Sequence, residues 1–307
     1  MNIIAKRKIF LTISGLLVAA SILAIAIFGF NQGIDFKGGT FWQIKFLPVV
    51  SASNPSEDNV PSVSGLQNFM DRELGLKTLA VLGSAGDFII RAPSISEAEH
   101  QDYLVKLKTK YGDLHELSFQ SIGPTIGHEL RERAITAVLL VLVGISLYIA
   151  FAFRKASKPV ASWKYGVVTL VTLFHDIALP TGMMAVFGKF YGAEIDTNFM
   201  VAILVILGFS VHDTIVVFDR IRENLMHERN KDELTRIVNM SVNDTMFRSI
   251  NTSLTLIIVL LTLLILGPDT LTYFILALLL GVVAGTYSSI FVASPLLTVW
   301  HDVAKRH

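Results

Sequence analysis

Six long apolar runs restrict the chain to a membrane fold. They are residues 9–29, 134–153, 165–187, 198–218, 250–267 and 271–299. A helix needs about 20 predominantly apolar residues to cross a bilayer, so each run is close to or longer than one spanning segment. The last run is long enough to tilt or to include an interfacial end. We therefore predict a polytopic α-helical membrane protein with six spans.

The overall composition agrees with this class and limits the chemistry. Charged residues make up 17% of the chain, whereas a soluble domain has about 25%. The net charge is +1, and no basic patch with interleaved aromatic residues suggests a nucleic-acid partner. The sequence has no cysteine, which removes disulfides, thiolate metal sites and cysteine nucleophiles. We expect no nucleic acid, no cofactor and no metal.

Basic residues indicate how the chain crosses the membrane. Three Lys or Arg precede the first run, four lie in 154–164, six in 219–250 and two at the C-terminus, whereas the short loops between contain only Lys189. The positive-inside rule then places both termini in the cytoplasm and residues 30–128 outside. Arg131 and Arg133, before the second run, are contrary, but long translocated domains follow this rule weakly.

The first run could also belong to a cleaved signal peptide, because basic residues precede it. A signal peptide has an apolar core of about 7–15 residues, which is shorter than this run. We therefore expect residues 1–29 to be a cytoplasmic N-terminus and first span. Residues 30–128 are expected to be an extracytoplasmic domain, and 129–307 a five-helix membrane domain.

The polar segment 30–128 has its own pattern of secondary structure. Alternating or apolar short runs predict strands at 41–46, 78–82, 87–92 and 114–120, and helical spacing predicts helices at 66–74 and from 97 to 111. Residues 83–86 (GSAG) fit a hairpin turn, and Ser96 with Glu99 fits a capping box. The order strand, helix, strand, strand, helix, strand is typical of a ferredoxin-like α+β domain. A less regular α+β domain is the alternative.

The apolar runs contain few ionisable residues, and Asp213 is the one that most restricts the possible function. It lies six residues before the charged cluster that begins at Asp219, or roughly 9 Å along a helix. A charged group within hydrocarbon costs about 3 kcal/mol, so it usually faces a partner or a water-filled path. Arg248 begins the fifth run, and Asn251, Thr252, Thr255 and Thr262 follow it at helical spacing.

Asp213 and Arg248 could therefore meet between neighbouring helices and carry protons. A static buried pair with Ser and Thr hydrogen bonds between helices is the alternative. His175, Asp176 and His212 could add to a relay or only pack between helices. Adjacent residues on a helix point to different faces, so neither His–Asp neighbour pair is a catalytic dyad by adjacency.

Enzyme motifs are missing from the sequence. His227 and Glu228 lack a second His at zinc-protease spacing, and no G-x-S-x-G, Walker A or Rossmann pattern occurs. Asp176 and Asp213 supply the two carboxylates of an intramembrane aspartyl protease, but the Gly-x-Gly-Asp setting such proteases resemble is missing. We expect no catalytic residue.

Four segments together resemble the SecF family, the membrane subunits of the bacterial SecD–SecF protein-export complex. They are GIDFKGGT (33–40), IGPTIGHELRERA (122–134), GFSVHDTIVVFDRIREN (208–224) and FRSINTSLT (247–255). The first contains the signature residues Gly33, Asp35, Gly38 and Gly39. The similarity covers nearly the whole chain and its six-span layout. His212 departs from the family, which often has Asn before this Asp.

The resemblance implies a function beyond what periodicity can give. SecF-like proteins belong to the resistance-nodulation-division superfamily, pair with SecD beside the SecYEG channel, and use the proton gradient to promote late steps of preprotein export. Asp213 and Arg248 match the family positions tied to proton passage. The partners implied are SecD, SecYEG, the translocating preprotein and membrane lipid. YajC and YidC are additional candidate partners. A proton-coupled exporter of small molecules and a purely structural translocon scaffold are the alternatives.

Overall fold

The computed structural model describes residues 2–47, 60–78, 80–84, 87–156, 160–227 and 234–304. The chain divides into two units: residues 1–31 with 134–307 form the membrane unit, and residues 32–133 form the α+β unit. The boundaries that the sequence suggested lie at 29/30 and 128/129. Most of the predicted 51–62 loop, and the second half of the 83–86 turn, lie outside the described residues.

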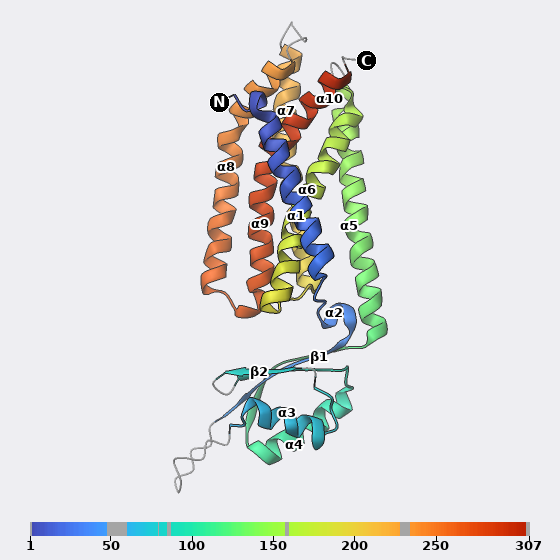
Figure 1. Cartoon of the computed structure of the whole chain (residues 1–307), viewed down its shortest axis with the longest axis vertical. Helices are drawn as coiled ribbons and strands as arrows, with labels where there is room; N and C mark the ends of the chain where they lie inside the picture. The colour runs from blue at the N-terminus through green and yellow to red at the C-terminus, as the bar shows by residue number, and fades with distance from the viewer. Residues whose placement is uncertain are drawn as a thin grey trace. The chain divides into compact units, whose positions relative to one another are not determined.

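The α+β unit contains one four-stranded sheet and two longer helices (Figure 1). Its elements run β1 (Gly39–Phe46), α3 (Val63–Arg72), β2 (Ala80–Ser84), β3 (Asp87–Ala92), α4 (Glu97–Tyr111) and β4 (Leu114–Ile122), after the short helix α2 (Ile34–Lys37). The strand order is β2-β3-β1-β4, and all neighbours are antiparallel. This order and connectivity confirm the ferredoxin-like prediction.

The alternation of β1 decides which face of the sheet is covered. Trp42, Ile44 and Phe46 are buried in the core that α3 and α4 complete. Phe41 and Gln43 point to the opposite face, where they are half-buried and not fully exposed. The capping box of α4 is confirmed: the Ser96 backbone N–H donates to Glu99 Oε2 over 2.7 Å, and the Glu99 N–H donates to Ser96 Oγ over 3.4 Å.

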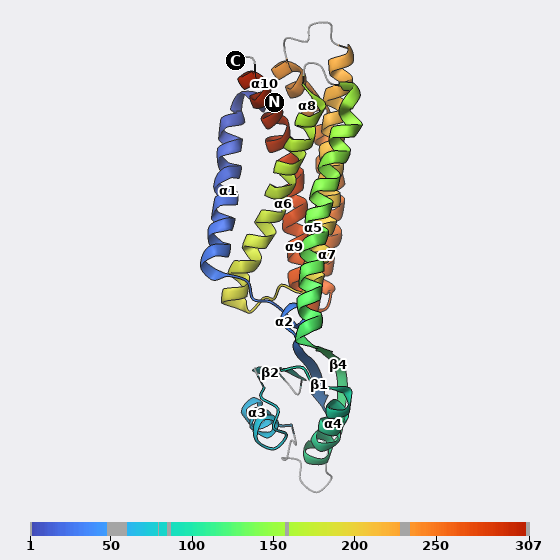
Figure 2. The same ribbon diagram turned by 90° about the vertical axis from the view of Figure 1, so that its right-hand side faces the viewer.

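The membrane unit contains six helical segments that are long and apolar enough to cross a membrane in the described part of the chain. They are Ile4–Phe28 (with α1, Arg7–Phe28), α5 (Pro124–Ala152), α6 (Ser162–Tyr191), α7 (Thr197–His227), α8 (Leu234–Leu266) and Thr272–Asp302, which joins α9 (Thr272–Ser288) to α10 (Ser294–Ala304) through a π-helical turn. The six-span prediction is confirmed. Helices α6 and α9 lie in the middle of the bundle (Figures 1 and 2).

Two of these helices are much longer than their apolar runs. Helix α7 continues to His227 and α8 begins at Leu234, so most of the 219–250 segment is helical and not a loop. The extensions hold because each keeps an apolar face: Ile221 and Leu225 of α7 pack in one buried cluster with Ile237 of α8. Hydropathy measures only the part in hydrocarbon, whereas amphipathic packing extends the helix beyond it.

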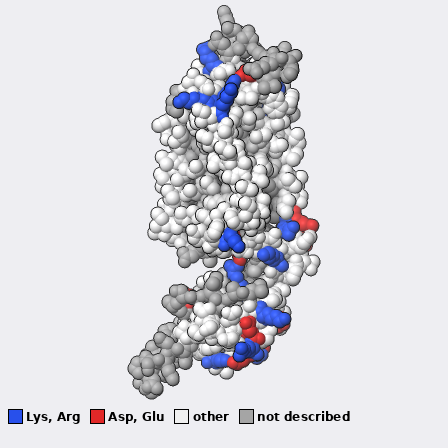
Figure 3. All heavy atoms as spheres, in the orientation of Figure 1, with Lys and Arg blue, Asp and Glu red and all other residues white. Residues whose placement is uncertain are grey.

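Both termini lie at the same end of the membrane unit (Figure 1). Arg7 forms an ion pair of 2.7 Å with Asp302, which ties α1 to the last helix there. At the opposite end, the Ile195 N–H donates to the Asn31 carbonyl over 2.8 Å. On the face seen in Figure 3, the middle of the membrane unit shows no charged side chain. This is the distribution expected of a bundle surrounded by lipid.

Candidate functional site

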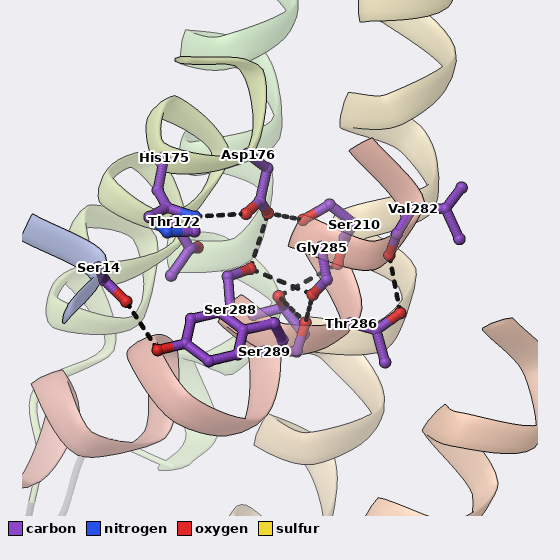
Figure 4. Close-up of polar contacts among 12 residues, drawn as sticks. Ser14, Thr172, His175, Asp176, Ser210, Val282, Gly285, Thr286, Ser288 and Ser289 are labelled. Carbon is purple, nitrogen blue, oxygen red and sulfur yellow. Dashed lines mark hydrogen bonds and ion pairs between the residues drawn. The ribbon is translucent and has the colours of Figure 1, made fainter. Parts of the chain in front are cut away.

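Polar side chains meet inside the bundle around the last turn of α9. Thr286, Tyr287, Ser288 and Ser289 are consecutive, so they point in different directions around the helix axis. Their hydroxyls contact Ser253 of α8 (2.5 Å), Ser14 of α1 (3.2 Å), Asp176 of α6 (2.7 Å) and Thr214 of α7 (3.0 Å), respectively. This turn thus joins four other helices through hydroxyl groups; Figure 4 shows the bonds of Ser14 and of Ser288 with Asp176.

The carboxylate of Asp176 is the most fully bonded ionisable group in this region. Its side chain is fully buried. Oδ2 accepts hydrogen bonds from Ser210 of α7 over 2.5 Å and from Ser288 of α9 over 2.7 Å. Gly285 permits this approach, because a Cβ there would lie 3.0 Å from the Cβ of Ser210. The remaining oxygen, Oδ1, faces the ring of His175.

His175 and Asp176 are in direct contact, although adjacent positions on a helix start on different faces. His175 Nδ1 lies 2.8 Å from Asp176 Oδ1, and both side chains are buried. Both side chains also contact α9, because Asp176 accepts from Ser288 and the His175 ring packs beside Tyr287. The His175 ring stacks on Tyr287 of α9 with 6.1 Å between centroids, which fixes its orientation.

Asp213 is also buried, with 2% of its surface exposed, but it is held loosely. Its Oδ2 lies 3.5 Å from the hydroxyl of Ser253 on α8, at the long limit for such a bond. The single proton of that hydroxyl has better acceptors, since the Ser249 carbonyl lies at 2.8 Å and Thr286 Oγ1 at 2.5 Å. Thr286 and the charges of His212 and Arg248 also act on this carboxylate.

The charge of Arg248 acts on the Asp213 carboxylate, but the two side chains do not pair directly. No ion pair joins these two residues in the part of the chain that the structure describes, and Arg248 is exposed on α8. Asn251, Thr252 and Thr255 are also exposed. The polar stripe expected on this helix therefore exists, but it faces outward and Ser253 occupies the inner face. His212, next to Asp213 on α7, is exposed as well.

The glycine signature lies in the α+β unit and serves a close backbone approach. Gly33 precedes α2, which contains Asp35, and Gly38 and Gly39 lead into β1. Gly38 has a φ of 76°, and a Cβ there would lie 2.7 Å from Pro124 Cα at the start of α5. A Cβ at Gly127 would in turn lie 2.9 Å from the Gly38 nitrogen. Only glycine fits both positions without moving the backbone.

Comparison with known proteins agrees with these features. The family described as "Protein export membrane protein SecD/SecF, C-terminal" matches residues 103–303, and the "SecD/SecF GG Motif" matches residues 23–40. The protein translocase subunit SecF of Thermobaculum terrenum is 41% identical over 305 residues, covering 98% of this chain and 94% of that protein. The subunit of the same name from Anaerolinea thermophila is 35% identical over 307 residues, covering 98% and 94%.

The chain belongs to the SecD/SecF family.

Solved structures of SecDF share the fold of this family member. SecDF from Thermus thermophilus, described as a translocon-associated membrane protein, has a TM-score of 0.78 at 32% identity, covering 98% of this chain. A SecDF structure in a super-membrane-facing form has a TM-score of 0.67 at 32% identity, covering the whole chain. This chain spans 39% of the length of each of those SecDF chains.

Reasoning from the sequence missed the hydroxyl groups of this site. Ser210, Ser253, Thr286, Ser288 and Ser289 all lie in apolar runs, where isolated Ser and Thr usually satisfy their own backbone carbonyls. A signal was present in the four consecutive polar residues 286–289 within an otherwise apolar run. It did not indicate which helices they would contact.

Proposed function

We propose that this chain is the SecF subunit of the Sec protein translocase and uses the proton gradient, together with SecD, to promote late steps of preprotein export. Its family membership and its relatives named protein translocase subunit SecF support the first part. The buried, loosely held carboxylate of Asp213 carries the second part. No enzymatic step is proposed.

The energetic requirement for such coupling is modest. One proton crossing a potential of about 100 mV releases about 2.3 kcal/mol, enough to bias an element with two conformations. Asp213 can take and release a proton, whereas the guanidinium of Arg248 stays charged. Arg248 therefore acts by approaching or leaving the carboxylate as helices α7 and α8 shift, and in the state described here it acts on Asp213 through its charge without a direct ion pair.

The outward polar stripe of α8 supports a partner within the membrane. Arg248, Asn251 and Thr252, with His212 of α7, would face lipid in an isolated chain. Charged groups are costly there, so such residues usually face protein or water. We propose that SecD covers this stripe. The length of the related SecDF chains leaves room for a second membrane portion beside the part that this chain matches.

The remaining partners and the location follow from the same proposal. The complex would work beside the SecYEG channel in the bacterial inner membrane, in the company of YajC and YidC, and would contact the translocating preprotein. Both termini would be cytoplasmic and the α+β unit extracytoplasmic. The sheet face opposite α3 and α4, with the half-buried Phe41 and Gln43, would be the surface that meets the preprotein.

The deciding experiment measures preprotein export in membrane vesicles with and without an imposed proton gradient. Asp213→Asn keeps the shape of the side chain but removes its ability to exchange a proton, so the gradient-dependent part of export should disappear while SecD still co-purifies. Asp219→Asn is the matched control, because this exposed carboxylate lies on the same helix and pairs with Arg222 at 3.6 Å. If Asp213→Asn vesicles respond to the gradient like the parent, Asp213 is structural and the scaffold alternative is favoured.

A further inference from the structure

His175 of the membrane unit has a buried ring nitrogen that forms no hydrogen bond in the described part of the chain. His175 Nε2 has no hydrogen-bond partner among the residues that the structure describes, although the side chain is only 4% exposed. Nearly all buried polar atoms in proteins are paired, so an unpaired one calls for an explanation. A histidine that served only to fasten helices together would satisfy both of its nitrogens.

The neighbouring contacts determine what this nitrogen can do. Asp176, when ionised, can only accept hydrogen bonds, so the 2.8 Å contact requires the proton of neutral His175 to be on Nδ1. The same carboxylate already accepts from Ser210 and Ser288. Its two oxygens thus have three donors, whereas His175 Nε2 is the polar atom of the pair that has no hydrogen-bond partner among the described residues.

We propose that His175 and Asp176 form a second proton-holding site of the membrane unit, with Nε2 of His175 as the atom that takes the proton. This inference rests on the proposed proton-driven function. A proton arriving at Nε2 converts imidazole to imidazolium, and the net charge of the pair changes from −1 to 0. On release the same proton leaves from Nε2, and the Nδ1–H bond to Asp176 persists throughout.

Helix α9 connects this site to Asp213. Ser288 donates to Asp176, and Thr286, two residues earlier, contacts the Ser253 hydroxyl that faces Asp213. A rotation or shift of this turn therefore changes the surroundings of both carboxylates together. Two features weaken the backbone there. A π-helical turn begins at Ser289, and Pro180 in α6 has no N–H to donate to the Asp176 carbonyl.

Few other titratable groups face the pair. Helix α9 presents Tyr287, which stacks on the ring. Helix α1 presents Ser14 and no ionisable residue at this depth. Helix α7 presents Ser210 and, one turn further, Asp213. A change of charge on the pair is therefore felt mainly by Tyr287 and Asp213.

The test follows the protonation of His175 in the full chain, co-purified with SecD and returned to lipid bilayers. The chain has eight histidines, so nitrogen-15 labelling of histidine with a His175→Gln spectrum assigns the signal. We expect His175 to change between an Nε2 without a proton and a fully protonated ring within the pH range in which the gradient drives export. The change should be lost in Asp176→Asn. A ring that keeps one protonation state throughout that range overturns the proposal.

Export supplies the functional half of the test. Asp176→Asn and His175→Gln should each lose the gradient-dependent part of export. Thr172→Val is the control, because it removes a buried hydroxyl one turn away that bonds only to backbone carbonyls of its own helix. If Asp176→Asn fails to assemble, the histidine spectrum of the parent chain still decides.

The two proposals can fail separately. Loss of the gradient response in Asp213→Asn but not in Asp176→Asn or His175→Gln would overturn the second site and leave the proposed function standing. An unchanged response in all three would overturn both. A response of the parent to a sodium gradient at constant pH, lost in Asp176→Asn, would show that the cluster holds a cation and overturn the proton assignment.

Discussion

The hydroxyl of Ser253 lies 3.5 Å from the carboxylate of Asp213, in a contact that links α8 to α7 at the centre of the bundle. The same hydroxyl lies closer to the Ser249 carbonyl and to Thr286. Asp176, in contrast, accepts two hydroxyl bonds of 2.5 and 2.7 Å and contacts His175 at 2.8 Å. Two buried carboxylates in one bundle thus differ in how firmly they are held.

This difference predicts unequal stability effects. Asp213→Asn removes no short hydrogen bond, so we expect a loss of less than about 1 kcal/mol in the free energy of unfolding. Asp176→Asn weakens three contacts in a buried network, and a loss of about 1–3 kcal/mol is expected. Thermal unfolding of the two variants and the parent in the same detergent measures this. Equal losses would contradict the contrast drawn from the contacts.

Arg248→Met should abolish the gradient-dependent part of export without a measurable change in stability. The residue is exposed and has no ion pair with Asp213 in the described part of the chain, so its removal breaks no buried contact. Exposed side chains away from such contacts usually change stability by less than about 0.5 kcal/mol. Lys189→Met, which removes one exposed positive charge near the end of α6, is the control for net charge. A full gradient response in Arg248→Met would exclude this residue from coupling.

The proposed orientation can be tested with single cysteines, because the chain has none of its own. Gln120 is an exposed residue of β4. Met226 is exposed near the C-terminal end of α7, at the same end of the membrane unit as the two termini. In intact spheroplasts, a membrane-impermeant maleimide should label Gln120→Cys and leave Met226→Cys unlabelled until the membrane is opened. The reverse pattern would invert the topology.

A comparison of two glycines with positive φ separates the cost of backbone strain from the cost of a steric clash with neighbouring backbone. Gly38 and Gly75 have φ angles of 76° and 70°, but only Gly38 has backbone atoms within 4 Å of an added Cβ. Gly75→Ala should therefore cost about 1 kcal/mol through strain alone, and Gly38→Ala about 3 kcal/mol or more, because Pro124 must also move. Hydrogen exchange of the β1 amides in the full chain compares the two variants. Similar exchange rates would show that the approach to Pro124 is relaxed at little cost.

The sequence by itself determined the class of this protein. Hydrocarbon thickness sets the length of a spanning helix, so six apolar runs were enough to predict six spans. The period-2 pattern of β1, with Trp42, Ile44 and Phe46 on one face, and the capping box at Ser96 were equally local signals, and the ferredoxin-like order followed from them. These features depend on neighbours in the chain or on the solvent, which the sequence contains or implies.

Only the tertiary structure decided the partners of the buried charges. Which face of α8 is turned inward depends on packing against α7 and α9, so Ser253 and not Arg248 approaches Asp213. The carboxylate of Asp176, which contacts His175, is also bonded by Ser288 of α9, 112 residues further along the chain. Rotations of helices about their own axes are set by close contacts such as that of Gly285 with Ser210. No local pattern encodes such rotations, because they result from fitting several helices together at once.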